Sequence, residues 1–227
     1  MNLTNLRQRL HALGASPGHA AHVLRRWVQA RPQDSGRRKP EHYLPLAVRN
    51  ALPTLLVEWS GLARVLSAHP GADGSERLLL ALGDGQTVEA VLLPKGGLCV
   101  STQVGCAVGC VFCMTGTGGL QRQLGSAEIV AQVALARTLR PVNKVVFMGM
   151  GEPAHNLEAV LEAIHLLGTG GNIGHKNLVF STVGDPISAV GRWWCRACQR
   201  SNGATPCSTK RCSRYSARVQ PTTPAPT

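Results

Sequence analysis

Apolar residues recur at helical spacing along residues 5–30, and the pattern is interrupted once, at residues 14–18. The interruption reads Gly-Ala-Ser-Pro-Gly, which is typical of a turn because glycine and proline both break regular structure. The pattern therefore predicts two short helices joined by a turn. Residues 31–40 are rich in charge and proline, and they predict a mobile connection after the second helix.

The period of the pattern changes further along the chain. Residues 78–93 place apolar runs on both sides of Asp84-Gly85, which predicts a β-hairpin because this pair tolerates the positive φ angles of a tight turn. A strand-like segment follows at 98–104. Predicted helices at 127–139 and 157–167 then alternate with predicted strands at 145–148 and 178–181. Such alternation favours parallel strands with crossover helices, and Ser126 is expected to cap the first of these helices.

Composition narrows the class of protein. The chain has 227 residues, of which 44% are hydrophobic, so it can bury a core. No uncharged apolar run reaches the roughly 18 residues that a membrane helix needs. The first residues scatter arginines among leucines, unlike an export signal. We therefore expect a cytoplasmic protein with no membrane partner.

Charge is distributed unevenly along the chain, whose formal net charge is +12. Residues 1–185 hold all 12 acidic residues and 17 of the 24 lysines and arginines, a balance of +5, whereas residues 186–227 hold seven bases and no acid. Even +5 is compatible with a nucleic-acid partner. The predicted N-terminal helices carry arginines that either form a solvated face or contact RNA, at positions Arg7, Arg9, Arg25, Arg26 and Arg31.

Three cysteines are clustered on a glycine-containing loop that follows a predicted strand. Cys106, Cys110 and Cys113 have the spacing Cys-x3-Cys-x2-Cys. Three thiols cannot all pair with one another, and clustering in a cytosolic protein favours metal over disulfides. A structural zinc site would need a fourth ligand. Cys99 lies on the preceding strand, where alternation could place it in the core, and three buried structural cysteines remain an alternative.

The three-cysteine spacing, with an aromatic residue just before the last thiol, resembles the signature of radical S-adenosylmethionine (SAM) enzymes. The resemblance extends over three motifs in order: residues 98–133, residues 145–156, which read VVFMGMGEPAHN, and residues 178–186, which read LVFSTVGDP. Together they closely resemble the RlmN/Cfr family of RNA methyltransferases. The match is strong over residues 78–186 and loose over the first seventy residues.

The resemblance implies two cofactors, a 4Fe-4S cluster and SAM. Cys106, Cys110 and Cys113 would hold the cluster and leave one iron open to SAM. Gly151, Glu152 and Ser181 would contact SAM. The sequence positions of Gly151 and Glu152 support this role, because both follow a predicted strand at its carboxyl end, where parallel α/β sheets bind ligands. A plain strand-to-helix turn remains the alternative for the glycine-rich segment.

The resemblance also implies a fold, a reaction and partners. The expected fold is α/β, an incomplete half of a partial TIM-type barrel with a small N-terminal helical domain over residues 1–70, barrel strands over 71–186 and a disordered tail over 187–227. The expected reaction is methylation of C2 of adenine in large-subunit rRNA and tRNA, and an electron donor protein would supply the reducing electron.

The last 40 residues depart from the family. The family's Gly-Cys-Gly-Gln-Leu type motif, and with it the methyl-carrying cysteine, is missing, so the catalytic cysteine is unknown. We expect that a frameshift or truncation after about Pro186 separates the tail from the family and leaves this chain without the C-terminal catalytic part and inactive. The alternative is a non-catalytic RNA-binding remnant that contains a metal cluster, or zinc held by tail cysteines: Cys195, Cys198, Cys207 and Cys212.

Overall fold

Three α-helices lie within the first 60 residues. The computed structural model describes residues 1–34 and 39–183. Helices α1 (Leu3–Ala12) and α2 (Pro17–Val28) confirm the two predicted short helices, and α3 (Leu46–Ser60) follows a short 3-10 turn, Pro40–His42. Ser16 caps α2, because its hydroxyl accepts a hydrogen bond from the His19 amide at 3.3 Å.

The three helices pack through apolar faces. The rings of Trp27 on α2 and Trp59 on α3 lie 5.3 Å apart, and Leu6 and Leu10 of α1 are fully buried. Sequence reasoning missed α3, which carries Pro53 in its interior. Proline removes one helical hydrogen bond, yet buried leucines on both sides of it hold this helix against its neighbours.

A six-stranded mixed sheet is the main structural element of the rest of the described chain. Its strand order is β1-β2-β3-β4-β7-β8, with β1 to β4 antiparallel and β4, β7 and β8 parallel. The predicted hairpin and the parallel strands are confirmed, but the hairpin and the unpredicted β1 extend the same sheet. The bounds are β1 (Ala63–Pro70), β2 (Glu76–Leu82), β3 (Thr87–Leu93), β4 (Gly97–Val100), β7 (Lys144–Phe147) and β8 (Leu178–Phe180).

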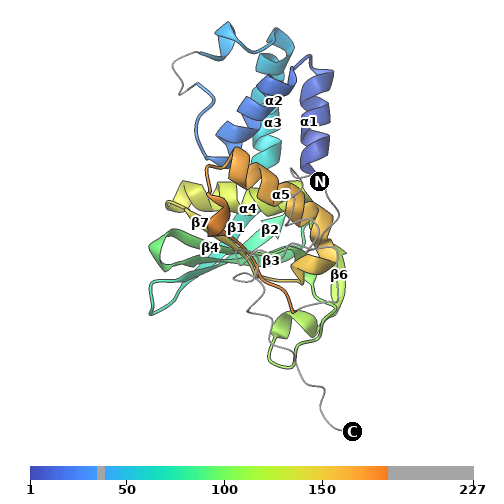
Figure 1. Ribbon diagram of the computed structural model, residues 1–227, viewed down its shortest axis with the longest axis vertical. Helices are drawn as coiled ribbons and strands as arrows, with labels where there is room; N and C mark the ends of the chain where they lie inside the picture. Colours follow the sequence, from blue (N-terminus) through green and yellow to red (C-terminus); the bar gives the residue numbers. More distant parts are fainter. Residues whose placement is uncertain (35–38, 184–227) are drawn as a thin grey trace, which may run out of the picture. The chain divides into compact units, whose positions relative to one another are not determined.

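The predicted strand at 98–104 is two strands. The chain leaves β4 at Ser101 and forms β5 (Gln103–Gly105), which pairs in antiparallel fashion with β6 (Leu120–Gln123) in a separate two-stranded sheet. A 3-10 turn, Met114–Gly116, lies in the loop between them. Figure 1 shows this loop extending from the sheet on the side away from α1, α2 and α3.

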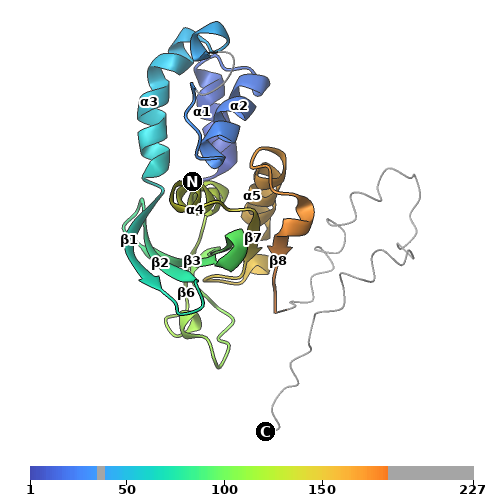
Figure 2. The ribbon, with the colours of Figure 1, turned by 90° about the vertical axis from the view of Figure 1, so that its left-hand side faces the viewer.

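Two crossover helices cover one face of the sheet. Helices α4 (Ser126–Leu139) and α5 (Leu157–Thr169) confirm the predicted helices, and Figure 2 shows both between the sheet and the helices α1 to α3. Most of α4 is buried on all sides because it contacts α1, α2 and α3 as well as β1 and β4. The expected cap was wrong by one residue: Gly125 is the N-cap, and its amide donates to the Glu128 carboxylate at 2.7 Å.

Residues 1–181 form one compact unit. The three N-terminal helices end at Ser60, and β1, which falls within the predicted helical domain, pairs with β2 in the sheet. Within the described part of the chain, no helix has the length and apolar character needed to cross a membrane. The predicted tail and its cysteines lie outside the described residues, as do four residues of the predicted connection, 35–38.

Candidate functional site

The cysteines lie on a loop that is closed at its base by two glycines. Gly105 and Gly119 both have positive φ angles, and a side chain at Gly105 would overlap the Gly119 carbonyl. That carbonyl accepts a hydrogen bond from the Cys106 amide at 3.1 Å. Residues 106–119 are therefore a loop between the paired strands β5 and β6, and we call them the cysteine loop.

The cysteine loop presents free thiols to its surroundings. Cys106 and Cys110 are partly buried and Cys113 is exposed, and none of the three is in a disulfide. Hydrogen bonds from Thr115 lower the pKa of the Cys113 thiol. The loop also exposes large apolar side chains, those of Val111, Phe112 and Met114.

The donor set fits a group that needs three thiolates, since thiolates are the usual ligands of iron-sulfur clusters. Nowhere in residues 1–34 and 39–183 do three His, Cys, Asp or Glu side chains lie close enough to hold a metal ion. Binding a cluster would therefore require the three thiols of the cysteine loop to move closer together. Cys99, the other cysteine of the described chain, is buried on β4, and its burial raises the pKa of its thiol.

The carboxyl ends of the three parallel strands meet at one edge of the sheet. Across the ladder Val100, Phe147 and Phe180 are in register, so the next residue of each strand lies at the same edge. Ser181, predicted to contact SAM, is one of these residues and is partly buried. The parallel pairing therefore brings together segments that are 80 residues apart in sequence, which the alternating pattern predicted.

A serine at this edge joins β4 to the turn after β7. The Ser101 hydroxyl donates to the Glu89 carbonyl at 2.5 Å and accepts from the Met150 amide at 2.8 Å. Gly149 packs so closely here that a Cβ on it would lie 2.8 Å from the Ser101 nitrogen. The side chain of Gln132 on α4 holds the backbone of Ser101 by two hydrogen bonds of 2.9 Å. This edge is thus rigidly hydrogen-bonded.

The turn at Gly151 and Glu152 lies directly against β5. Gly151 has a φ of +96°, and a Cβ there would come within 2.5 Å of the Gln103 Cβ. The Glu152 amide donates to the Gln103 side-chain oxygen at 2.7 Å. The Glu152 side chain is buried, and one of its oxygens accepts from the Ala154 amide at 2.9 Å. The structure therefore brings the predicted SAM-contact turn next to the strand that leads into the cysteine loop.

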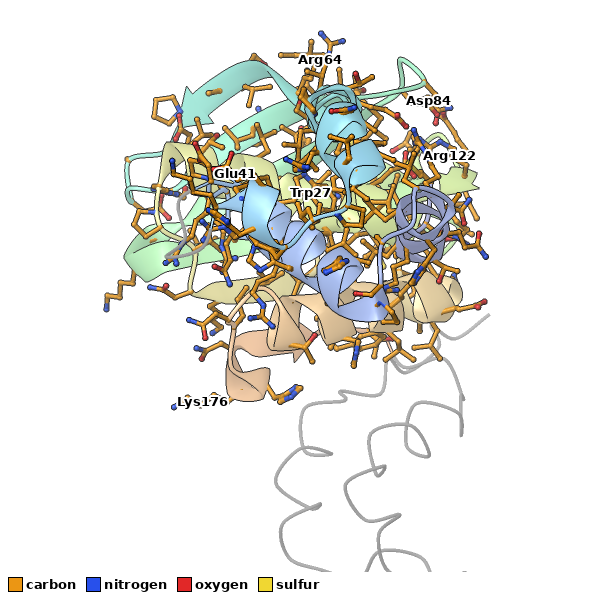
Figure 3. The ribbon with its side chains drawn as sticks, turned by 90° about the horizontal axis from the view of Figure 1, so that it is seen from above. Trp27, Glu41, Arg64, Asp84, Arg122 and Lys176 are labelled. Atoms are coloured by element: carbon orange, nitrogen blue, oxygen red, sulfur yellow. The ribbon has the colours of Figure 1, made fainter. Side chains whose placement is uncertain are left out.

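A second set of contacts fixes β6 from the other side. The Arg122 guanidinium bonds both carboxylate oxygens of Glu128, at 2.8 and 3.1 Å, and reaches Asp84 at 2.7 Å. Figure 3 shows Arg122 and Asp84 side by side. The Arg122 Nε also donates to the Gln86 side chain at 2.9 Å. Arg122 therefore attaches β6 both to the β2–β3 turn and to the start of α4.

The structure gives different environments to the five arginines of the N-terminal helices. Arg7 pairs with Glu162 at 2.9 Å, and both guanidinium amino groups of Arg9 donate to the Glu58 carboxylate. Arg26 is buried and donates to the Pro32 carbonyl at 3.1 Å. Arg9, Arg25 and Arg31 are exposed, whereas Arg7 is partly buried. Three of the five arginines therefore have structural contacts within the chain.

Sequence reasoning missed the residues that join these parts. Gln103 lies in a predicted strand, Gln132 in a predicted helix and Gln123 in the segment before that helix, and nothing in their local pattern marks them. Gln103 and Gln132 are buried, and polarity at a buried position is a signal that only a known fold can reveal. The predicted site residues themselves are placed at the sheet edge or on the adjoining loop.

The arrangement defines a class of domain: parallel strands whose carboxyl edge carries a three-cysteine loop beside a glycine-rich turn. Residues 100–192 match the family model of the radical SAM superfamily. This segment of the chain therefore matches a radical SAM domain, and its described residues, 100–183, have the expected α/β fold.

Relatives of known sequence are similar over most of the chain. A probable RNA methyltransferase of Azoarcus sp. is 70% identical over 185 residues, which are 82% of this chain and 53% of that protein. A probable RNA methyltransferase of Methylibium petroleiphilum is 71% identical over 185 residues, 82% of this chain and 52% of that protein. The chain thus spans about half the length of the curated relatives it matches.

A solved structure supports the same class. The crystal structure of a radical SAM methyltransferase from Sphaerobacter thermophilus superposes with a TM-score of 0.63 at 31% sequence identity, covering 86% of this chain and 59% of that one. The radical SAM domain predicted from the cysteine spacing is thereby confirmed, together with homology to RNA methyltransferases.

Proposed function

We propose that this protein is a radical SAM methyltransferase of the RlmN/Cfr type, which methylates C2 of adenine in large-subunit rRNA and in tRNA. One observation carries the proposal: the Gly151-Glu152 turn, at the carboxyl edge of the parallel strands, packs against the buried strand β5, which leads directly into a loop with three free thiols. The similarity to proteins named probable RNA methyltransferases supports RNA as the substrate class.

In this proposal Cys106, Cys110 and Cys113 hold a 4Fe-4S cluster through their thiolates. Gly151 and Glu152 bind SAM, as Gly151 lets the backbone approach the ligand and Glu152 offers a buried carboxylate for the methionyl ammonium. Ser181 contacts SAM from the end of β8. When bound, the cluster supplies the electron that cleaves SAM to methionine and a 5'-deoxyadenosyl radical.

In this proposal the residues of the chain itself hold the ligand-binding segments in position. Hydrogen bonds of Ser101 and Gln132 and the close packing of Gly149 fix the sheet edge, so the ligand-binding segments cannot move independently. The apolar side chains of the cysteine loop can exclude water from a cofactor held among them. We also propose that an electron donor protein reduces the cluster and that the reaction takes place in the cytoplasm, where rRNA and tRNA are found.

The first test is of the cluster ligands. Purified chain is reconstituted with iron and sulfide under anaerobic conditions, and iron content and visible absorbance are measured. Replacing Cys106, Cys110 or Cys113 by Ala should abolish the cluster, while the matched control Cys99→Ala should retain it. Iron content that is the same in the loop variants and the control would refute the assignment.

The second test is of the reaction. The reconstituted protein is given SAM, a chemical reductant and either large-subunit rRNA or tRNA, and the products are analysed by mass spectrometry. Formation of 5'-deoxyadenosine together with 2-methyladenosine would support the proposal. If the protein forms a cluster and binds RNA but yields neither product, the result would favour the non-catalytic RNA-binding alternative.

A further inference from the structure

Gln103 connects the two parts of the candidate site. Its side chain is fully buried, and its amide oxygen accepts the hydrogen bond from the Glu152 backbone at 2.7 Å. Its amide nitrogen donates to the Gln123 side-chain oxygen on β6 at 2.9 Å. Gln123 continues the chain of contacts, because its own amide nitrogen donates to the His155 carbonyl at 3.0 Å. One buried amide thus contacts both sides of the site.

The geometry leaves little freedom at this contact. The positive φ of Gly151 directs the turn against Gln103, and no side chain larger than hydrogen fits between them. A buried amide costs free energy unless both its donor and its acceptor are bonded. Here one bond is made to the Gly151-Glu152 turn and the other to β6, the strand that follows the cysteine loop. An apolar residue would fill the same volume with no such requirement. The polar side chain therefore sets a relative position as well as filling space.

We propose that Gln103 is a positioning residue, which holds the base of the cysteine loop at a fixed distance from the Gly151-Glu152 turn and thereby sets the affinity for SAM. This inference rests on the proposed function. It predicts that breaking either bond of Gln103 weakens SAM binding while the three cysteines still bind the cluster.

The test compares two variants with a control. Gln103→Met keeps the volume and removes both hydrogen bonds, whereas Gln123→Met removes the bond to β6 and leaves the bond to Glu152. Gln121→Met is the matched control, since Gln121 is an exposed glutamine on the same strand β6. Iron content, equilibrium binding of SAM to the reconstituted protein, and amide hydrogen exchange at Glu152 are measured for each.

We expect Gln103→Met to weaken SAM binding about tenfold or more, the cost of leaving a buried group unpaired, with normal iron content. Exchange at the Glu152 amide should become faster in Gln103→Met and stay slow in Gln123→Met, although both variants bind SAM more weakly. The electron paramagnetic resonance signal of the reduced cluster should change less on addition of SAM in both variants than in the control.

Three outcomes would overturn the positioning role of Gln103, and one of them would also overturn the proposed function. Wild-type SAM affinity in both variants would overturn the positioning role and leave the proposed function intact. An unchanged Glu152 exchange rate in Gln103→Met would overturn it as well. An unaltered chain that takes up neither iron nor SAM would overturn the proposed function itself, and this role of Gln103 with it.

Discussion

Glu162 on α5 is the point where three helices are joined, and its removal should destabilise the domain measurably. Its carboxylate accepts hydrogen bonds from Thr4 at 2.7 Å and from Arg7 at 2.9 Å, both on α1, and another from the Ser126 hydroxyl at the start of α4. Ser126 in turn accepts from the Leu3 amide at 2.8 Å. The substitution Glu162→Ala removes all the bonds to the carboxylate at once.

The size of the effect follows from the number and burial of these bonds. A net hydrogen bond contributes roughly 0.5 to 1.5 kcal/mol, and bonds to a charged group contribute more. The Glu162 side chain is 22% exposed, so solvent screens part of the gain from the Arg7 charge. We expect a loss of about 2 kcal/mol, which lowers the melting temperature of a domain of this size by about 4 to 8 °C.

The same substitution should be sensitive to pH. Burial acts to raise the pKa of Glu162, but bonds from Ser126 and Thr4 and the charge of Arg7 outweigh it and hold the pKa below its ordinary value of 4.5. A carboxyl whose folded pKa is lowered stabilises the fold above its unfolded pKa, and this stabilisation is lost as the pH falls through the folded pKa. The difference between wild type and Glu162→Ala should therefore be full at pH 7 and shrink below pH 4.5.

Urea denaturation at a series of pH values measures this difference, with Glu158→Ala as the matched control because Glu158 is an exposed glutamate on the same helix. The reasoning is refuted if Glu162→Ala costs no more stability at pH 7 than Glu158→Ala, or if its cost stays constant down to pH 3.

Other substitutions test other parts of the structure. Gly151→Ala places a Cβ within 2.5 Å of Gln103 at a φ of +96°, so it should reduce SAM binding at least tenfold in an equilibrium binding assay, while Gly174→Ala, in open space, should not. Arg137 donates to three backbone carbonyls at 2.8 to 3.1 Å, so Arg137→Met should cost about 2 to 4 kcal/mol in chemical denaturation. Arg122→Met should loosen β6 and accelerate amide exchange in residues 120–123, and unchanged exchange would contradict the role given to its contacts.

Local sequence was sufficient to predict the elements that frame the site. Asp84-Gly85 marked the hairpin because turn chemistry is decided within two residues, and the alternation after residue 126 marked the parallel strands because hydrophobic period follows the geometry of each element. The cysteine spacing likewise lies within eight residues. Such signals depend on neighbours in the chain, which a single sequence displays directly.

Tertiary structure alone decided how these elements are held together. Gln103 and Glu152 are 49 residues apart, and Leu3 and Ser126 are 123 apart, so no local pattern relates them. The helix α3 tolerates Pro53 only because its leucines are buried by other segments, and Arg7 and Arg9 have carboxylate partners only because the helices pack as they do. Hydrogen bonds and ion pairs act over a few ångströms, so their partners are determined once the whole chain has folded.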